Sequence, residues 1–220
     1  KMLIVVAREE GSGTRAAFEE MVMDEALIVD TALLQASNGA VRTTVSTTPD
    51  AIGFLSFGYL DESVKGLQID GVAPTPENAG DGSYPVVRPL NMMTLGEPSG
   101  AAAAWLDFIL GDAGQALVAE DYIPVSAPAA APAVELSGNV SVAGSTTVQP
   151  LAETLAEAFT AQNPDVEITV QGGGSSVGVK SAGQGAADIG MASREVKDSE
   201  KAEYPELQIY TIARDGIAIV

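Results

Sequence analysis

The chain has 220 residues, of which 46% are apolar, and its 30 acidic and 11 basic residues give a formal net charge of −19. This length and apolar content suffice for a globular core, whereas the negative charge argues against binding to nucleic acid or to an anionic membrane. Cysteine and histidine are both absent, which excludes disulfides and removes both the usual base of serine hydrolases and the commonest zinc ligand. We therefore expect neither a metal ion nor a cofactor.

Membrane insertion is not expected either, because no stretch reaches the ~20 apolar residues that a membrane-spanning helix requires. Arg8, Glu9 and Glu10 interrupt the first apolar run, so the N-terminus lacks the pattern of a signal peptide. If the protein is exported, its signal has been removed or lies outside this chain.

The first part of the chain mixes strand-like and helix-like patterns. A strand at 2–7 precedes a helix from about Thr14 to Leu27, and a second helix is predicted over 28–37, ending at the pair Asn38-Gly39, which suits a helix C-terminus or a turn. The elements predicted after it are strands at 51–56 and 67–69, a loop at 71–83, a strand at 86–93, and helices at about 99–110 and 112–120.

Residues 126–139 form an Ala/Pro-rich tract of low complexity. Such a tract cannot build a core and favours an extended, semi-rigid linker. After it the pattern alternates plainly, with strands at 140–143, 166–170, 187–191, 207–212 and 216–220 and helices at 148–162 and 176–183. Alternating strands and helices predict an α/β fold with a parallel-rich sheet.

Three strand-to-helix loops carry small hydroxyl residues and glycines. They are Gly11 to Thr14 with Arg8 before them, Gly144 to Thr147, and Gly172 to Ser176. In open α/β sheets ligands bind beyond the carboxyl ends of the strands, where such loops offer N–H and O–H donors to an oxyanion. Ordinary helix capping by Ser and Thr is the alternative for each loop taken alone.

Two further polar sites are open to more than one interpretation. Ser193 and Arg194 follow a short apolar strand, and Arg194 either belongs to the site or pairs with a surface carboxylate such as Glu195 or Asp198. Asp215-Gly216 is most simply a turn between two strands. The alternative is that Asp215 accepts the proton of a hydrogen phosphate.

Four motifs together resemble one family. They are Arg-Glu-Glu-Gly-Ser-Gly-Thr-Arg (8–15), Val-Ala-Gly-Ser-Thr-Thr-Val-Gln-Pro (142–150), Gln-Gly-Gly-Gly-Ser-Ser-Val-Gly-Val-Lys (171–180) and Ala-Asp-Ile-Gly-Met-Ala-Ser-Arg-Glu (187–195). They resemble the substrate-binding proteins of phosphate-specific ABC transporters, over nearly the whole chain outside the linker. The resemblance implies a two-lobed periplasmic-binding-protein fold of type II that closes on inorganic phosphate.

The resemblance also implies a set of ligand-binding residues. Where many family members have an aspartate that accepts the phosphate proton, this chain has Arg194, so Asp215 or another acid would have to replace that aspartate. The expected set is Arg8, Ser12, Gly13, Thr14, Ser145, Thr146, Thr147, Ser175, Ser193 and Arg194.

The order of the motifs differs from that of the family, in which the Gly-Ser-Thr-Thr segment comes first. We interpret the chain as circularly permuted: 1–88 forms part of lobe two, while 89–125 and 140–220 form lobe one and are joined by the linker 126–139. In the family, a further stretch of chain connects the segment that matches 215–220 to the segment that matches 3–6. That stretch has no counterpart in this sequence.

The expected function is therefore that of an extracytoplasmic phosphate receptor, which binds no nucleic acid, works with an ABC permease and is not an enzyme. One alternative is a cell-surface or engineered assembly subunit on the same fold, self-associating by pairing its sheet edges with a neighbouring chain. Another is a hydrolase that uses Ser12 or Ser145, against which the absence of histidine weighs.

Overall fold

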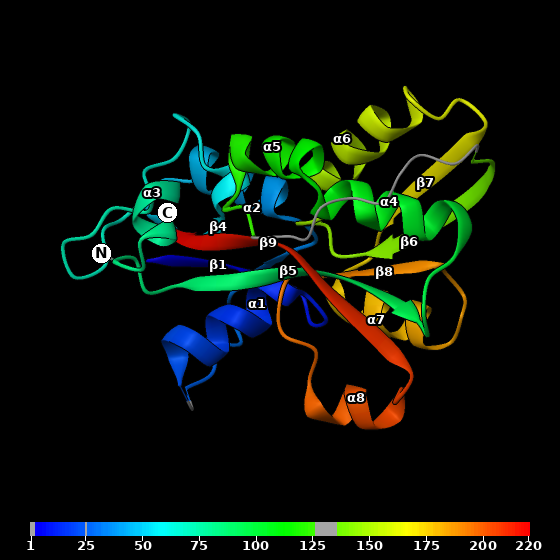
Figure 1. Cartoon of the computed structure of the whole chain (residues 1–220). Coiled ribbons are helices and arrows are strands. Elements are labelled where there is room, and N and C mark those ends of the chain that lie inside the picture. Colours follow the sequence, from blue (N-terminus) through cyan, green and yellow to red (C-terminus); the bar gives the residue numbers. More distant parts are fainter. Residues whose placement is uncertain (1–2, 25, 126–135) are drawn as a thin grey trace.

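The computed structural model describes residues 3–24, 26–125 and 136–220, which form a mixed α/β fold with two sheets (Figure 1). Most of the expected linker 126–139 lies outside the described residues. In the smaller sheet the central strand β1 runs parallel to both of its neighbours. In order across that sheet, the strands are β2 (Leu33–Gln35), β1 (Ile4–Arg8) and β3 (Ala51–Ile52).

The larger sheet has six strands and combines parallel and antiparallel pairs. In order across the sheet they are β4 (Phe54–Ser56), β9 (Leu207–Ile219), β5 (Val87–Leu95), β8 (Ile189–Ala192), β6 (Gly138–Gly144) and β7 (Val166–Gly172). Strands β6, β7 and β8 are parallel, whereas β5 runs antiparallel to both β8 and β9. Figure 1 shows β5 and β9 side by side across the molecule.

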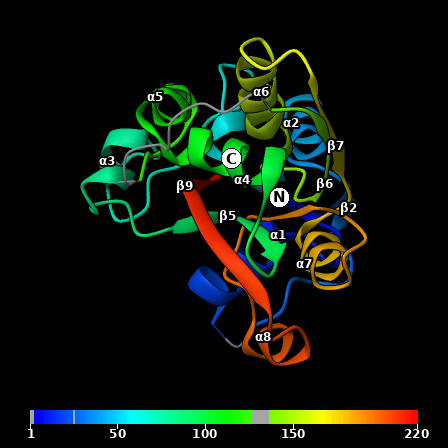
Figure 2. The same cartoon turned by 45° about the vertical axis from the view of Figure 1, so that its right-hand side comes forward.

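Helices cover both faces of the larger sheet. In the views of Figures 1 and 2, α4, α5 and α6 lie on one side of it and α7 on the other. The helices are α1 (Gly13–Phe18), continued by a π-helical turn (Glu19–Met23), α2 (Asn38–Thr47), α3 (Pro76–Gly80), α4 (Gly100–Leu110), α5 (Asp112–Asp121), α6 (Gln149–Thr160), α7 (Ser175–Gly183) and α8 (Asp198–Glu203), with a 3-10 turn (Phe57–Tyr59). None of the helices in the described part of the chain is both long and apolar enough to cross a membrane.

Two main clusters of buried side chains divide the molecule into lobes. Lobe one is built around Trp105, Leu155 and Ile189, and lobe two around Val6 and Phe54. Strand β9 contributes to both cores, since Ala213 packs in lobe one whereas Ile217, Ala218 and Val220 pack in lobe two.

The helix predicted over 28–37 is wrong. Residues 33–35 are β2, and the helix begins at Asn38 instead of ending there. The cause is Ser37, whose Oγ accepts a hydrogen bond from the backbone N of Ala40 and so caps a new helix N-terminus. The helix predicted from Thr14 to Leu27 is also shorter, because helical structure stops at Met23.

The turn predicted at Asp215-Gly216 is wrong as well. Residues 207–219 form one continuous strand, β9, which pairs with β5 from Leu207 to Gly216. Gly216 serves close packing here, because a Cβ at this position would collide with the ring of Phe57. The predicted strand at 67–69 is reduced to a single bridge between Ile69 and Val72.

Candidate anion-binding site

Four loops from both lobes converge at the carboxyl ends of parallel strands. The loop after β7 contacts the loops after β6 and β1: Gly174 N donates to Gly144 O over 2.9 Å and Ser176 N donates to Gly11 O over 3.2 Å. The loop after β6 also reaches β8, because Ser145 N donates to Met191 O over 2.9 Å. The expected Ser/Thr-Gly loops therefore lie together.

Arg8, the last residue of β1, is 1% exposed and carries the positive charge into this region. Its Nη2 donates to Thr146 Oγ1 over 3.1 Å, which joins lobe two to lobe one. The guanidinium also binds the carboxylate of Glu9 and the backbone carbonyl of Gln35. Its Nη1 is buried and has no hydrogen-bond partner among the described residues, so one strong donor remains available.

Beside Arg8 lies a first group of buried polar side chains. Thr14 Oγ1 and Thr147 Oγ1 are 3.1 Å apart, and Asn38 Nδ2 donates to Thr147 Oγ1 over 2.8 Å. All three side chains are almost completely buried. The Oδ1 atom of Asn38 is buried and has no hydrogen-bond partner in the part of the chain that the structure describes.

A second group consists of three buried serines of lobe one. Ser145 Oγ donates to Ser193 Oγ over 2.9 Å, and Ser193 N donates to Ser175 Oγ over 3.0 Å. Gly13 of lobe two lies directly against them, since a Cβ on Gly13 would be 2.6 Å from Ser193 Oγ and closer still to Ser175 Oγ. Hydroxyl groups can donate to an anion once they rotate.

Ser12 has the capping role that was the alternative for its loop. Its Oγ accepts from the backbone N of Arg15 over 3.3 Å and caps α1. The Ser12 side chain is therefore engaged within lobe two.

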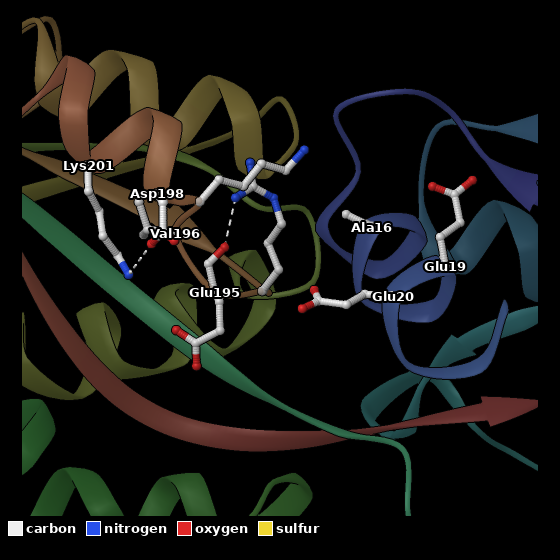
Figure 3. Close-up of a pocket in the computed structure, with 9 residues that line it drawn as sticks. Ala16, Glu19, Glu20, Glu195, Val196, Asp198 and Lys201 are labelled. Atoms are coloured by element: carbon white, nitrogen blue, oxygen red, sulfur yellow. Dashed lines mark hydrogen bonds and ion pairs between the residues drawn. The ribbon is translucent and has the colours of Figure 1, made fainter. Parts of the chain in front are cut away.

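Arg194 lies at the edge of the cluster, where its Nη2 donates to Ser176 Oγ over 3.2 Å. Its guanidinium makes two 2.8 Å hydrogen bonds to the carboxylate of Glu200 and one of 2.8 Å to the backbone carbonyl of Glu195, so the carboxylates suggested by sequence, those of Glu195 and Asp198, are not the ones it takes. Although burial opposes the effect, the hydrogen bond from Arg194 lowers the pKa of Glu200 below its usual value. Arg194 instead lines a groove of about 630 Å³, between Glu19 and Glu20 on one wall and Glu195, Asp198 and Lys201 on the other (Figure 3).

Sequence reasoning missed the ion pair of Arg88 and Asp215, which contacts the serine group through the backbone of Ser193. Arg88 Nη2 and Asp215 Oδ2 are 2.8 Å apart, and both side chains are fully buried. Arg88 Nη1 donates to the carbonyl of Ser193 over 3.0 Å. The available signal was the presence of charged residues within otherwise apolar strands.

Asp215 has no oxygen left for a ligand. Its Oδ1 accepts from Ser56 Oγ and Phe57 N, and its Oδ2 accepts from Nε and Nη2 of Arg88. Burial raises the pKa of the Asp215 carboxyl, and these donors oppose that rise. Within the described ranges no group of three or more His, Cys, Asp or Glu side chains is placed to hold a metal ion.

Comparison with known proteins identifies the family. The model of the PBP superfamily domain matches residues 2–113 and 127–220. Phosphate-binding protein PstS 2 of Streptococcus agalactiae serotype V is 41% identical over 98% of this chain and 77% of its own length. The chain belongs to the PBP superfamily, in the family of phosphate-binding proteins. A second relative in this family, phosphate-binding protein PstS 2 of Streptococcus pneumoniae serotype 4, is 38% identical over the same shares of both chains.

A solved structure of the phosphate-binding protein family supports the same fold. The crystal structure of a phosphate-binding protein of a phosphate ABC transporter from S. pneumoniae TIGR4 matches with a TM-score of 0.77 and 37% identity, covering 100% of this chain and 88% of that one. The expected type II periplasmic-binding-protein fold is thus confirmed. The family consists of substrate-binding receptors and not of enzymes, and neither the hydrolase nor the assembly alternative is favoured.

Proposed function

We propose that this chain binds inorganic phosphate between its two lobes, as the extracytoplasmic receptor of an ABC uptake system that passes phosphate to a permease. The observation that carries the proposal is the buried Nη1 of Arg8, which has no partner within the described residues and belongs to the guanidinium that donates to Thr146. An arginine surrounded by hydroxyls matches the tetrahedral, multiply charged shape of phosphate. The names of the relatives support the same ligand.

Each lobe contributes part of the proposed contact set. Arg8, Gly13 and Thr14 would approach phosphate from lobe two, while the hydroxyls of lobe one would approach it from the opposite side. The contributing residues of lobe one are Ser145, Thr146, Thr147, Ser175 and Ser193. Binding then favours the closed state, because only that state offers both sets of contacts at once.

Calorimetric titration with phosphate tests this proposal. We expect affinity in the micromolar range or tighter for the wild-type chain, and a loss of at least ~100-fold for Arg8→Ala, since charge-assisted hydrogen bonds contribute about 1.5–3 kcal/mol each. Arg42→Ala is the matched control, because Arg42 pairs with Asp61 at the surface. A flat wild-type titration would count against the proposal.

A further inference from the structure

Two opposite orphan groups lie in the buried polar cluster between the lobes. Arg8 Nη1 is a donor without a partner, and Asn38 Oδ1 is an acceptor without a partner, among the described residues. Buried polar atoms are rarely left unpaired, because a donor or acceptor removed from water without a partner destabilises the folded state. The donor suits any oxyanion, but the acceptor suits only a ligand that brings a hydrogen atom of its own.

The other candidate acceptors in this region are already occupied. All four donors that Asp215 can accommodate are in place. Both oxygens of Glu9 accept from Arg8, and its side chain is 34% exposed, so its remaining capacity faces solvent. Backbone carbonyls near the cluster are used too, since Thr146 O accepts from Tyr59 Oη and Thr147 O from Tyr122 Oη. Asn38 Oδ1 stands apart as a buried acceptor with free capacity.

Asn38 is held in a fixed position within the cluster. It is the first residue of α2 and 0% exposed, and its Nδ2 donates to Thr147 Oγ1, the hydroxyl that also contacts Thr14. Because Oδ1 and Nδ2 share one carbon atom, Oδ1 lies beside this group of hydroxyls.

We propose that Asn38 is a specificity-determining residue whose Oδ1 accepts the hydrogen bond of the P–OH group of hydrogen phosphate. The inference rests on the proposed phosphate function and deepens it. It assigns to a neutral amide on lobe two the role for which the sequence offered only acids. Sulfate, which carries no proton near neutral pH, would leave Oδ1 unpaired unless the amide turns.

An amide and a carboxylate differ in one testable respect. Rotation of the Asn38 amide by half a turn exchanges Oδ1 for Nδ2, so that the side chain can donate to sulfate while Thr147 donates to Oδ1. A carboxylate only accepts, whichever way it turns. Replacing Asn38 by Asp should therefore retain the contact to P–OH and remove any accommodation of sulfate.

The experiment compares calorimetric affinities for phosphate and sulfate at about pH 8, where phosphate carries nearly the same double charge as sulfate. Long-range repulsion by a new carboxylate then cancels in the ratio of the two affinities. The variants are Asn38→Asp, Asn38→Ala and Asn78→Asp, the last adding the same charge near the start of α3, away from the cleft. Thermal unfolding checks that each variant is folded.

We expect Asn38→Asp to raise the phosphate-to-sulfate affinity ratio at least ~10-fold, and Asn38→Ala to weaken phosphate binding about 10-fold through the unpaired P–OH group. Asn78→Asp should change neither quantity. A ratio for Asn38→Asp close to that of the wild type overturns the inference while leaving phosphate binding intact. If Asn38→Asp does not fold, unchanged phosphate affinity of Asn38→Ala overturns it, and a wild-type chain without phosphate binding overturns both proposals.

Discussion

Gly13 lies where the loop after β1 meets the serine group of lobe one. A side chain at this position would collide with the hydroxyls of Ser175 and Ser193. The requirement concerns space and not backbone conformation, because Gly13 is not among the residues with positive φ. The close approach of the two lobes therefore depends on the absence of a Cβ at Gly13.

For Gly13→Ala we expect phosphate affinity to fall at least ~10-fold. The added methyl group would hold the lobes apart, and the contacts to phosphate that form only in the closed state would be lost. Calorimetry measures the affinity. Gly80→Ala is the matched control, since its Cβ would meet only Ile123 at 3.9 Å. Wild-type affinity in Gly13→Ala would show that the lobes do not approach as closely as described.

At the scale of single residues, the sequence predicted most of the polar cluster but not all of it. Ser145, Thr147 and Ser175 follow strands in recognisable Ser/Gly loops and Ser193 follows a short apolar strand, so their convergence could be expected. Asn38 was assigned to a helix end, because an Asn-Gly pair is typical of helix C-termini and turns and the cap provided by Ser37 was not considered. For this reason Asn38 was not predicted as a site residue.

Among the elements, the pair β5 and β9 carries a buried ion pair. Arg88 and Asp215 are directly opposite each other in the register of these strands. Through Arg88 the pair holds the carbonyl of Ser193, and through Asp215 it holds Ser56 and the backbone of Phe57 in lobe two. The ion pair thus links both lobes to the same two strands.

Asp215→Ala should lower the free energy of unfolding by about 3–5 kcal/mol, because it leaves the buried Arg88 charge without a partner. Urea denaturation measures the loss. The double variant Arg88→Met with Asp215→Leu should recover most of it, since no charge then remains in the core. A loss below about 1 kcal/mol for the single variant would contradict the role given to this pair.

The junction of β9 with the segment before β5 should make stability sensitive to high pH. Tyr84 donates from Oη to Ile217 O over 2.8 Å, and burial raises the pKa of Tyr84 to about 12. Since the folded-state pKa lies above the unfolded value of about 10, this contribution is complete below pH ~10 and is lost as the pH rises towards 12.

Tyr84→Phe should reduce the loss of stability between about pH 10 and 12, and should lower stability at neutral pH by about 1 kcal/mol for the missing hydrogen bond. Thermal or urea unfolding at several pH values measures both effects. Tyr210→Phe serves as a control, because the Tyr210 hydroxyl makes no hydrogen bond to the described residues. An unchanged slope in Tyr84→Phe would show that other tyrosines dominate the alkaline transition.

At the scale of elements, alternation and amphipathic spacing predicted most strands and helices. The helix around Leu151, Leu155 and Phe159 is an example, since α6 buries these side chains. Strand β9 was predicted as two strands, because Asp215-Gly216 taken alone is typical of a turn. In the structure these residues are extended, because β9 pairs with β5 from Leu207 to Gly216. Pairing between distant segments overrides local preference.

For the whole molecule, the position of the chain ends bears on the proposed circular permutation. Ile4 N donates to Asp50 O and Gly53 N donates to Val220 O, so Ile4 and Val220 both lie beside the short segment 50–53. Close termini are a common condition for circular permutation.

We predict that a rearranged chain, running from 137 to 220 and then through a linker of about six flexible residues to 3–125, retains phosphate affinity within about threefold, because such a linker spans roughly 13 Å. Calorimetry and circular dichroism compare it with the present order. Failure of the rearranged chain to fold would speak against interchangeable orders.

Strand β9 also constrains how the protein is made. The core of lobe two needs Ile217, Ala218 and Val220 beside residues such as Val6 and Phe54, and β4 pairs only with the final part of β9. During translation, Val6 is synthesised near the beginning of the chain and residues 217–220 near its end. Domains usually fold from the N-terminal side during synthesis. Lobe two, in contrast, cannot complete its core until residues 217–220 have left the ribosome, and its apolar side chains stay exposed until then.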